Sequence, residues 1–146
     1  MNIKECTVDD CERIDYILNH ATVKPGFFSH KDYVVNSKES INFDEMYVIM
    51  PTQDILFLGT PNGSELTFEV HGAVLPCARG KLAVVAAKRC IRYMFTETKC
   101  VRLEARCRKG RKDTLMFDYA CGFKFDAQLS NGDILLSINR EDFTNG

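Results

Sequence analysis

The stretch of residues 65–99 decides the fold, and it reads ELTFEVHGAVLP, then CARGK, then LAVVAAKRCIRYMFTETK. Its first part alternates as a strand does, with polar side chains on one side and, on the other, Leu66, Phe68 and Val70. Proline cannot donate a hydrogen bond to a sheet, so Pro76 is expected to end this strand. The pattern therefore predicts a strand over residues 65–75.

A short basic turn and a helical pattern follow this strand. The turn is Arg79-Gly80-Lys81, and the helix is expected from about residue 80 to residue 97. Its apolar stripe consists of Leu82, Val85, Ala86, Cys90 and Met94. Free amides and the positive end of the helix dipole converge at a helix N-terminus, so strand, turn and helix together predict an anion-binding site.

These three elements resemble the core of the GNAT superfamily of N-acetyltransferases. In that family the fourth strand leads into a loop that wraps the pyrophosphate of acetyl-coenzyme A. Arg79 matches the first position of the loop, whereas Leu82 and Val84 replace a glycine and a small residue. By this resemblance, the acetyl-coenzyme A site comprises Val74, Leu75, Arg79, Gly80, Lys81, Leu82, Ala83 and Arg111.

The N-terminal half is expected to follow the order of elements of that family. A first strand is predicted over residues 1–6, then a helix from a Thr7 capping box to about His20, broken by Lys24-Pro25-Gly26. Residues 27–44 have no clean period and form a short helix or a loop. Strands are predicted over 46–50 and 55–58, with turns at 51–54 and at Pro61-Asn62-Gly63.

The C-terminal half completes the predicted fold. A strand over 100–107 is expected to run parallel to the strand over 65–75, because the helix between them makes a right-handed crossover. A helix over 113–121 stopped by Gly122 and a hairpin of strands 123–128 and 134–138 follow. The prediction is a single α/β domain over 1–146. Its mixed, mostly antiparallel sheet is flanked by helices and splayed between the fourth and fifth strands.

Candidate catalytic residues follow from the needs of acetyl transfer to an amine: a held thioester, a polarised carbonyl and a deprotonated amine. The resemblance implies polarising backbone amides near residues 72–74, with Gly72 marking either a bulge or close packing. Glu69 and His71 share the polar face of a central strand, where ionisable groups are costly unless the face opens on a cleft. Either is a candidate general base, the alternative being a solvated face. Tyr119 is the candidate general acid, one residue after the family's tyrosine position, which Asp118 occupies.

Charge is unevenly distributed along the chain. Residues 79–112 contain twelve Lys or Arg and two Glu, so their net charge is about +10 against about −11 elsewhere. This implies an anionic partner, such as coenzyme A or nucleic acid, or a solvated basic face. The basic loop over 106–112 has no interleaved aromatic residues suited to stacking on bases.

Length and composition indicate which class of protein this is. The 146 residues, 45% of them apolar, suit one globular domain. No run reaches the length of a membrane span and the N-terminus lacks signal-peptide features, so a soluble cytoplasmic protein without a membrane partner is expected. Seven cysteines occur without a C-x-x-C pair or a close histidine, which indicates buried or half-buried free thiols and no metal site.

The preferred interpretation is an N-acetyltransferase that uses acetyl-coenzyme A and acts on an amine of a small molecule or of a protein. The departures at Leu82, Val84, Arg111 and Asp118 favour an alternative, a catalytically degenerate binding protein. A weaker resemblance to small phage-encoded GNAT-like proteins implies a role in particle assembly, with virion proteins as partners. A third hypothesis is a nucleic-acid-binding module that uses residues 79–112, and a homodimer is compatible with each.

Overall fold

The computed structural model of the chain describes residues 3–27 and 32–143. Within them, six strands form one mixed sheet in the order β1-β2-β3-β4-β6-β5. The antiparallel meander consists of β1 (Tyr47–Thr52), β2 (Ile55–Ser64) and β3 (Thr67–Val74). The parallel neighbour of β3 is β4 (Arg102–Cys107), as predicted. Antiparallel pairing then joins β4 to β6 (Ile134–Asn139) and β6 to β5 (Lys124–Gln128).

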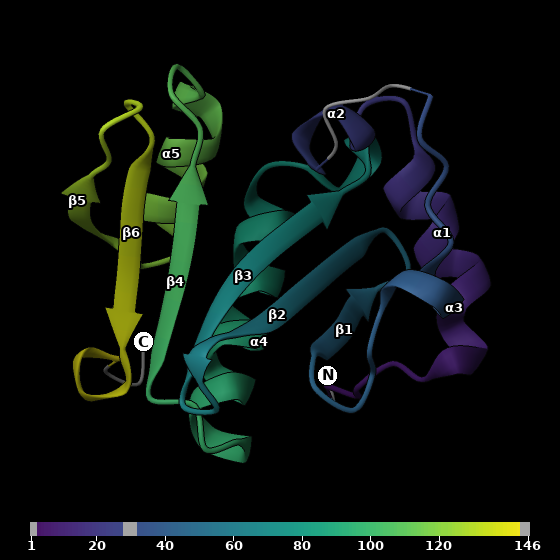
Figure 1. Cartoon of the computed structure of the whole chain (residues 1–146), viewed down its shortest axis with the longest axis horizontal. Helices are drawn as coiled ribbons and strands as arrows, with labels where there is room; N and C mark the ends of the chain where they lie inside the picture. Colours follow the sequence, from purple (N-terminus) through teal and green to yellow (C-terminus); the bar gives the residue numbers. More distant parts are fainter. Residues whose placement is uncertain (1–2, 28–31, 144–146) are drawn as a thin grey trace.

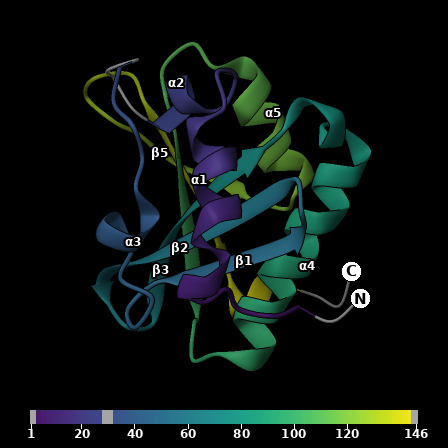
Figure 2. The same cartoon turned by 90° about the vertical axis from the view of Figure 1, so that its right-hand side faces the viewer.

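Helices cover both faces of the sheet (Figures 1 and 2). Successive residues of a strand point to opposite faces, so Val48 packs with α1 (Cys11–Asn19) while Ile49 packs with α4 (Lys81–Glu97). The crossover from β3 to β4 is α4, and α5 (Lys112–Ala120) packs against the same core. The short helices α2 (Lys24–Phe27) and α3 (Ser37–Ser40) lie on the side of α1. Single 3-10 turns occur at Val8–Asp10, Pro76–Ala78 and Arg140–Asp142.

The predicted capping box opens the 3-10 turn Val8–Asp10 that leads directly into α1. The Thr7 amide donates to Asp10 Oδ2 at 2.8 Å, and the Asp9 amide donates to the Thr7 hydroxyl at 3.3 Å. Ile14 and Ile17 are fully buried, as their helical spacing predicts.

The predicted apolar stripe of α4 is wrong at its first two members. Leu82 and Val85 are 53% and 50% exposed. The small side chains of Ala83 and Ala86 face the sheet instead, which lets the first turns of α4 approach Ile55 closely. The remaining predicted members, Ala86, Cys90 and Met94, are buried together with Ile91 and Phe95.

The predicted first strand is also wrong over the residues that are described, 3–6. They make an isolated bridge between Glu5 and Ile49, supported by the Cys6 amide donating to the Val48 carbonyl at 2.7 Å. Residues 1 and 2 of that prediction lie outside the described chain. The prediction that Lys24-Pro25-Gly26 breaks the first helix is also wrong. The helix α1 already ends at Asn19, and Lys24-Pro25-Gly26 form the start of the short helix α2.

Two predicted turns fall inside strands. β1 continues through Pro51, which an edge strand tolerates, so the turn shrinks to Gln53-Asp54. β2 continues through Pro61-Asn62-Gly63 to Ser64, and the chain reverses at Glu65-Leu66. Among the described residues the pairing of β2 with β1 ends at Gly59, so Pro61 lies on a free edge and its missing N–H costs no ladder bond.

The C-terminal predictions are confirmed within one residue or two. Gly122 follows α5 with φ of +105°, a left-handed conformation that favours glycine and stops the helix. The hairpin of β5 and β6 closes where the Leu129 amide donates to the Asp133 carbonyl at 2.8 Å. Alternation along 100–107 places Val101, Leu103 and Ala105 on one face; Leu103 and Ala105 are buried, whereas Val101, which precedes β4, is 40% exposed.

Candidate active site

The candidate site lies where β3 and β4 separate. In the described chain their parallel pairing covers three rungs, Thr67–Arg102, Phe68–Leu103 and Glu69–Glu104, and then ends. Each strand continues beyond its last rung, β3 to Val74 and β4 to Cys107, and Figure 1 shows the two arrowheads diverging. The predicted splay is therefore present, between the strands that are β3 and β4 here.

Backbone amides of β3 face this opening. The Leu75 amide points toward β2, because it donates to the Asp54 carbonyl at 3.0 Å. Because amides alternate along a strand, those of Val70, Gly72 and Val74 point to the opposite edge, toward β4. Gly72 pairs with Phe57 without a register shift, and a Cβ built on it meets nothing within 4 Å. Both expectations for Gly72, a bulge and close packing, are therefore wrong: the opening comes from the divergence of the strands.

The N-terminus of α4 lies next to the end of β3. Gly80 is the N-cap, with φ of +95°, and no described side chain caps the helix. The first intrahelical bond runs from the Val84 amide to the Gly80 carbonyl at 3.2 Å, which leaves the amides of residues 81–83 at the exposed end. Leu82 points to solvent, so its bulk does not cover these amides.

Arg79 precedes this helix and connects three elements. Its Nε donates to the Val74 carbonyl at 3.3 Å, and its terminal nitrogen donates to the Thr22 hydroxyl at 3.1 Å. On the other side of the opening, Arg108 donates to the Pro25 carbonyl at 3.3 Å. Two predicted basic segments therefore contact neighbouring points of the chain, Thr22 just before α2 and Pro25 within α2.

Glu69 and His71 project together from the other face of β3, as predicted. Glu69 Oε1 lies 3.6 Å from His71 Nε2, and the two side chains are 33% and 43% exposed. The His71 ring lies against the Phe27 ring of α2, with centroids 5.9 Å apart. Glu69 is thus half-buried at the last rung, where the strands begin to separate.

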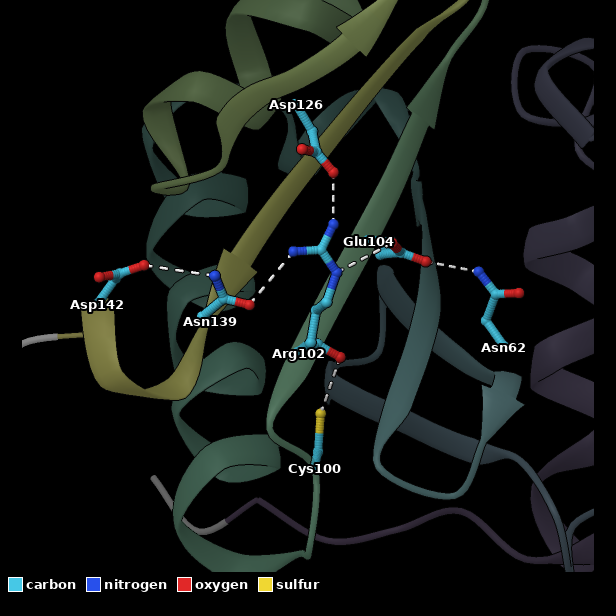
Figure 3. Close-up of polar contacts among 7 residues, drawn as sticks. All are labelled: Asn62, Cys100, Arg102, Glu104, Asp126, Asn139 and Asp142. Carbon is cyan, nitrogen blue, oxygen red and sulfur yellow. Dashed lines mark hydrogen bonds and ion pairs between the residues drawn. The ribbon is translucent and has the colours of Figure 1, made fainter. Parts of the chain in front are cut away.

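Glu104 faces Glu69 across that rung, and its carboxylate is held by a polar network that sequence analysis did not identify (Figure 3). Arg102 Nε donates to Glu104 Oε2 at 3.0 Å, and Asn62 donates to Oε1 at 2.6 Å. Arg102 also pairs with Asp126 on β5 and donates to Asn139 on β6 at 3.3 Å. Burial lowers the pKa of Arg102, but its bonds to Glu104 and Asp126 outweigh burial and raise the pKa above its ordinary value.

The signal for this network was present in the alternation of CVRLEARC. Leu103 and Ala105 of β4 are buried, so Arg102 and Glu104 must share the opposite face. In Figure 1 the described helices leave the front of β4 and β6 uncovered, and this is the face that carries the network.

The remaining predicted site residues are spread around the opening. Leu75 is buried at the end of β3, and Lys81 is exposed in the first turn of α4. Arg111 is the N-cap residue of α5, and its guanidinium pairs with Asp113 at 3.3 Å. Tyr119 is 40% exposed, whereas its neighbour Asp118 is half-buried.

The cysteines are free thiols, and most of them are buried or half-buried as expected. Cys77 is the exception, because it is exposed in the 3-10 turn before Arg79. Burial raises the pKa of Cys90 to about 12. The described residues contain no group of three metal-ligating side chains. None of their helices is long and apolar enough to cross a membrane.

Comparison with known proteins identifies the fold. No protein-family model matches the sequence, and no curated protein matches it. A GNAT-family acetyltransferase from Bacillus anthracis superposes with a TM-score of 0.71 and 16% identity, over 95% of this chain and 94% of that one. Spermidine N-acetyltransferase from Vibrio cholerae, solved with CoA and spermine, gives a TM-score of 0.77 and 16% identity, over 97% and 96%. The GNAT domain of PAT from S. lividans superposes with a TM-score of 0.72 and 15% identity, over 94% of this chain and 89% of that one.

The chain therefore has the GNAT acetyltransferase fold, a mixed sheet flanked by helices and opened between two parallel strands. At these identities the likeness establishes the fold. These three structures give no support to the weaker resemblance to phage-encoded proteins.

Proposed function

We propose that this protein is an N-acetyltransferase that moves acetyl from acetyl-coenzyme A to an amine, as a single domain over residues 1–146. The observation that carries the proposal is the separation of β3 from β4 beside an uncapped helix N-terminus. An acyl-coenzyme A combines an extended chain, a carbonyl that needs polarisation and a pyrophosphate. The free edge of β3, with its amides facing the opening, suits the extended chain and the carbonyl. The N-terminus of α4 suits the pyrophosphate.

The proposed phosphate-binding residues are the amides of Lys81, Leu82 and Ala83, with Gly80 allowing close approach. Arg79 adds a guanidinium that can form charge-assisted hydrogen bonds to phosphate. It can do so by exchanging its neutral partner, the Thr22 hydroxyl. Val74 and Leu75 are assigned to the acyl end of the site, and Arg111 to its α5 side.

The proposed general base is Glu69, with His71 as the rival or partner. Glu104, the other carboxylate of the last rung, is already bound by Arg102 and Asn62. Glu69 is therefore the carboxylate that can accept a proton from the acceptor ammonium. The amine nitrogen then attacks the thioester carbon, and the amides of β3 stabilise the negative charge on the carbonyl oxygen.

The acceptor is proposed to be a cationic amine that approaches over the uncovered face of β4. Glu104 and Asp126 share the single cation of Arg102, and Glu69 is paired with no arginine of the described chain, so this end of the sheet keeps a net negative charge that attracts a protonated amine. The similarity to a spermidine N-acetyltransferase solved with spermine makes a polyamine the first acceptor to test.

The test is isothermal calorimetry with CoA, acetyl-coenzyme A and a short single-stranded RNA, followed by an acetylation assay with spermine. The proposal predicts binding of CoA and acetyl-coenzyme A, with release of free thiol when spermine is added. Binding of both cofactors without acetylation of any amine or protein screened would favour the non-enzymatic alternative. Binding of RNA in place of CoA would favour the nucleic-acid-binding alternative.

A further inference from the structure

The segment Pro61-Asn62-Gly63, which lies inside β2 and forms no turn, contains a reactive pair of residues. In an Asn-Gly pair the glycine nitrogen can attack the carbonyl carbon of the asparagine side chain, because no Cβ shields that nitrogen. This reaction makes asparagine one of the thermolabile residues of proteins. The described chain contains two such pairs, Asn62-Gly63 and Asn131-Gly132, and a third, Asn145-Gly146, lies outside it.

The backbone of the first pair bulges out of the ladder between β2 and β3. Pro61 and Ser64 are paired with two successive residues of β3, so Asn62 and Gly63 are extra residues between these rungs. Both are exposed. Gly63 has φ of +80°, and a Cβ built on it would meet nothing within 4 Å. This segment can therefore rearrange without displacing a packed neighbour of the glycine.

The second pair is held by the turn between β5 and β6. The Gly132 amide, which would be the attacking group, donates to the Leu129 carbonyl at 2.9 Å. Asn131 Oδ1 accepts from the Asp133 amide at 3.0 Å, and Asn131 Nδ2 donates to Asp133 Oδ2 at 3.1 Å. A Cβ built on Gly132 would lie 2.7 Å from the Lys109 side chain, so this turn is packed as well as hydrogen-bonded. The same dipeptide is therefore more restrained here than in β2.

The side chain of Asn62 bridges two strands that are not neighbours in the sheet. Its Nδ2 donates from β2 to Glu104 Oε1 of β4 at 2.6 Å, past the intervening β3 (Figure 3). Glu104 is 14% exposed and is also bound by Arg102. The bridge lies at the end of the sheet where three rungs join β3 to β4. A carboxylate in place of the Asn62 amide would therefore put a like charge where Glu104 now has a donor.

We propose that Asn62 is a site of spontaneous deamidation, with water as the co-reactant, and that its product uncouples β2 from β4. The bond to Glu104 opens, and the Gly63 nitrogen forms a bond to Cγ of Asn62. The carbon–nitrogen bond of the side-chain amide breaks, and ammonia leaves with the proton of the Gly63 amide. Water then opens the resulting succinimide at either carbonyl and gives aspartate or isoaspartate. The inference is independent of the proposed acetyltransferase activity.

The first experiment follows deamidation of the full chain in mildly alkaline buffer by peptide mapping with mass spectrometry. The rate of each pair in urea, where the sequence alone acts, is the reference for its rate in the folded protein. Relative to that reference, Asn62 should react about tenfold faster than Asn131, because the bond of the Gly132 amide must open in addition. Equal relative rates, a faster reaction at Asn131, or no product at Asn62 in the folded protein would overturn the proposal.

The second experiment measures the consequence in variants that do not need the reaction. Asn62→Asp should unfold at a lower urea concentration than Asn62→Ala, because the aspartate repels Glu104 in addition to losing the donor. In a Glu104→Gln background this difference should disappear. Amide hydrogen exchange at the rungs between β3 and β4 should be faster in Asn62→Asp than in the wild type. Equal stability of the two variants, or a difference that persists in Glu104→Gln, would overturn the uncoupling.

Discussion

Glu69 on β3 and Glu104 on β4 form the last rung across the two strands, and their carboxylates have different partners. Glu104 accepts from Arg102 at 3.0 Å and from Asn62 at 2.6 Å, whereas Glu69 lies 3.6 Å from His71. Two carboxylates on one rung would repel each other if neither were neutralised. The Arg102 network therefore compensates Glu104 and allows Glu69 to remain an accessible base.

Replacement of Glu69 tests that division of roles. Glu69→Gln should lower the rate of acetyl transfer to spermine at neutral pH by about 10²-fold, because the ammonium would lose its proton acceptor. The affinity for CoA, measured by calorimetry, should be nearly unchanged. His71→Ala serves as the matched comparison for the rival assignment. If neither variant slows turnover, the base is another group.

Replacement of Arg79 tests the phosphate site. Arg79→Ala should weaken CoA binding about 10–100-fold, since a hydrogen bond to a charged group contributes about 1.5–3 kcal/mol. Arg89→Ala is the control, because Arg89 is exposed farther along α4 and its loss changes the net charge equally. Equal affinities in both variants would contradict the assignment. Thermal unfolding reports separately on the lost contacts to Thr22 and Val74.

Removal of Arg102 should destabilise the sheet. Arg102→Ala leaves Glu104, whose side chain is 14% exposed, without its cationic partner, and we expect the free energy of unfolding to fall by about 2–3 kcal/mol. Arg106→Ala removes an arginine that is 48% exposed, and its partner Asp133, also 14% exposed, keeps hydrogen bonds from the Lys109 amide and from Asn131, so the cost should be smaller than for Arg102→Ala. Urea titrations of both variants provide the comparison. Adding Glu104→Gln to Arg102→Ala should recover part of the loss.

The pKa of Asp118 predicts a dependence of stability on pH. Burial raises this pKa to about 7, above the value of about 3.9 in an unfolded chain. Stabilisation by the protonated form is therefore complete below about pH 4 and is lost as pH rises through about 7. Asp118→Asn keeps a neutral group at all pH values. Its free energy of unfolding should match the wild type near pH 4 and exceed it by about 1–3 kcal/mol near pH 8.

Asp133 gives the control of opposite sign. The Lys109 amide, followed by Arg106 and Asn131, lowers the pKa of Asp133 below its ordinary value, so its stabilisation is present above that value and is lost in acid. Asp133→Asn should therefore be less stable than the wild type at neutral pH. If Asp118→Asn were also less stable near pH 8, the carboxylate of Asp118 would have an unrecognised favourable partner.

Sequence by itself determined the features that depend on residues close together in the chain. The strand before Pro76, the basic turn, the helix ending at Glu97 and the parallel strand after it were all predictable, as was the Thr7 capping box. Alternation also predicted that Glu69 and His71 share a face. In each case the period of the side chains, or a single cap or proline, fixes the local conformation.

Tertiary structure decided what depends on pairing between distant segments. The turn signal Pro61-Asn62-Gly63 was overridden because β2 pairs with β3 beyond the end of β1, where a proline costs little. The end of the β3–β4 ladder at Glu69 and Glu104 follows from how the two strands diverge, which no local pattern encodes. For the same reason the Arg102 network and the half-buried position of Asp118 emerged only when β4, β5, β6 and α5 were brought together.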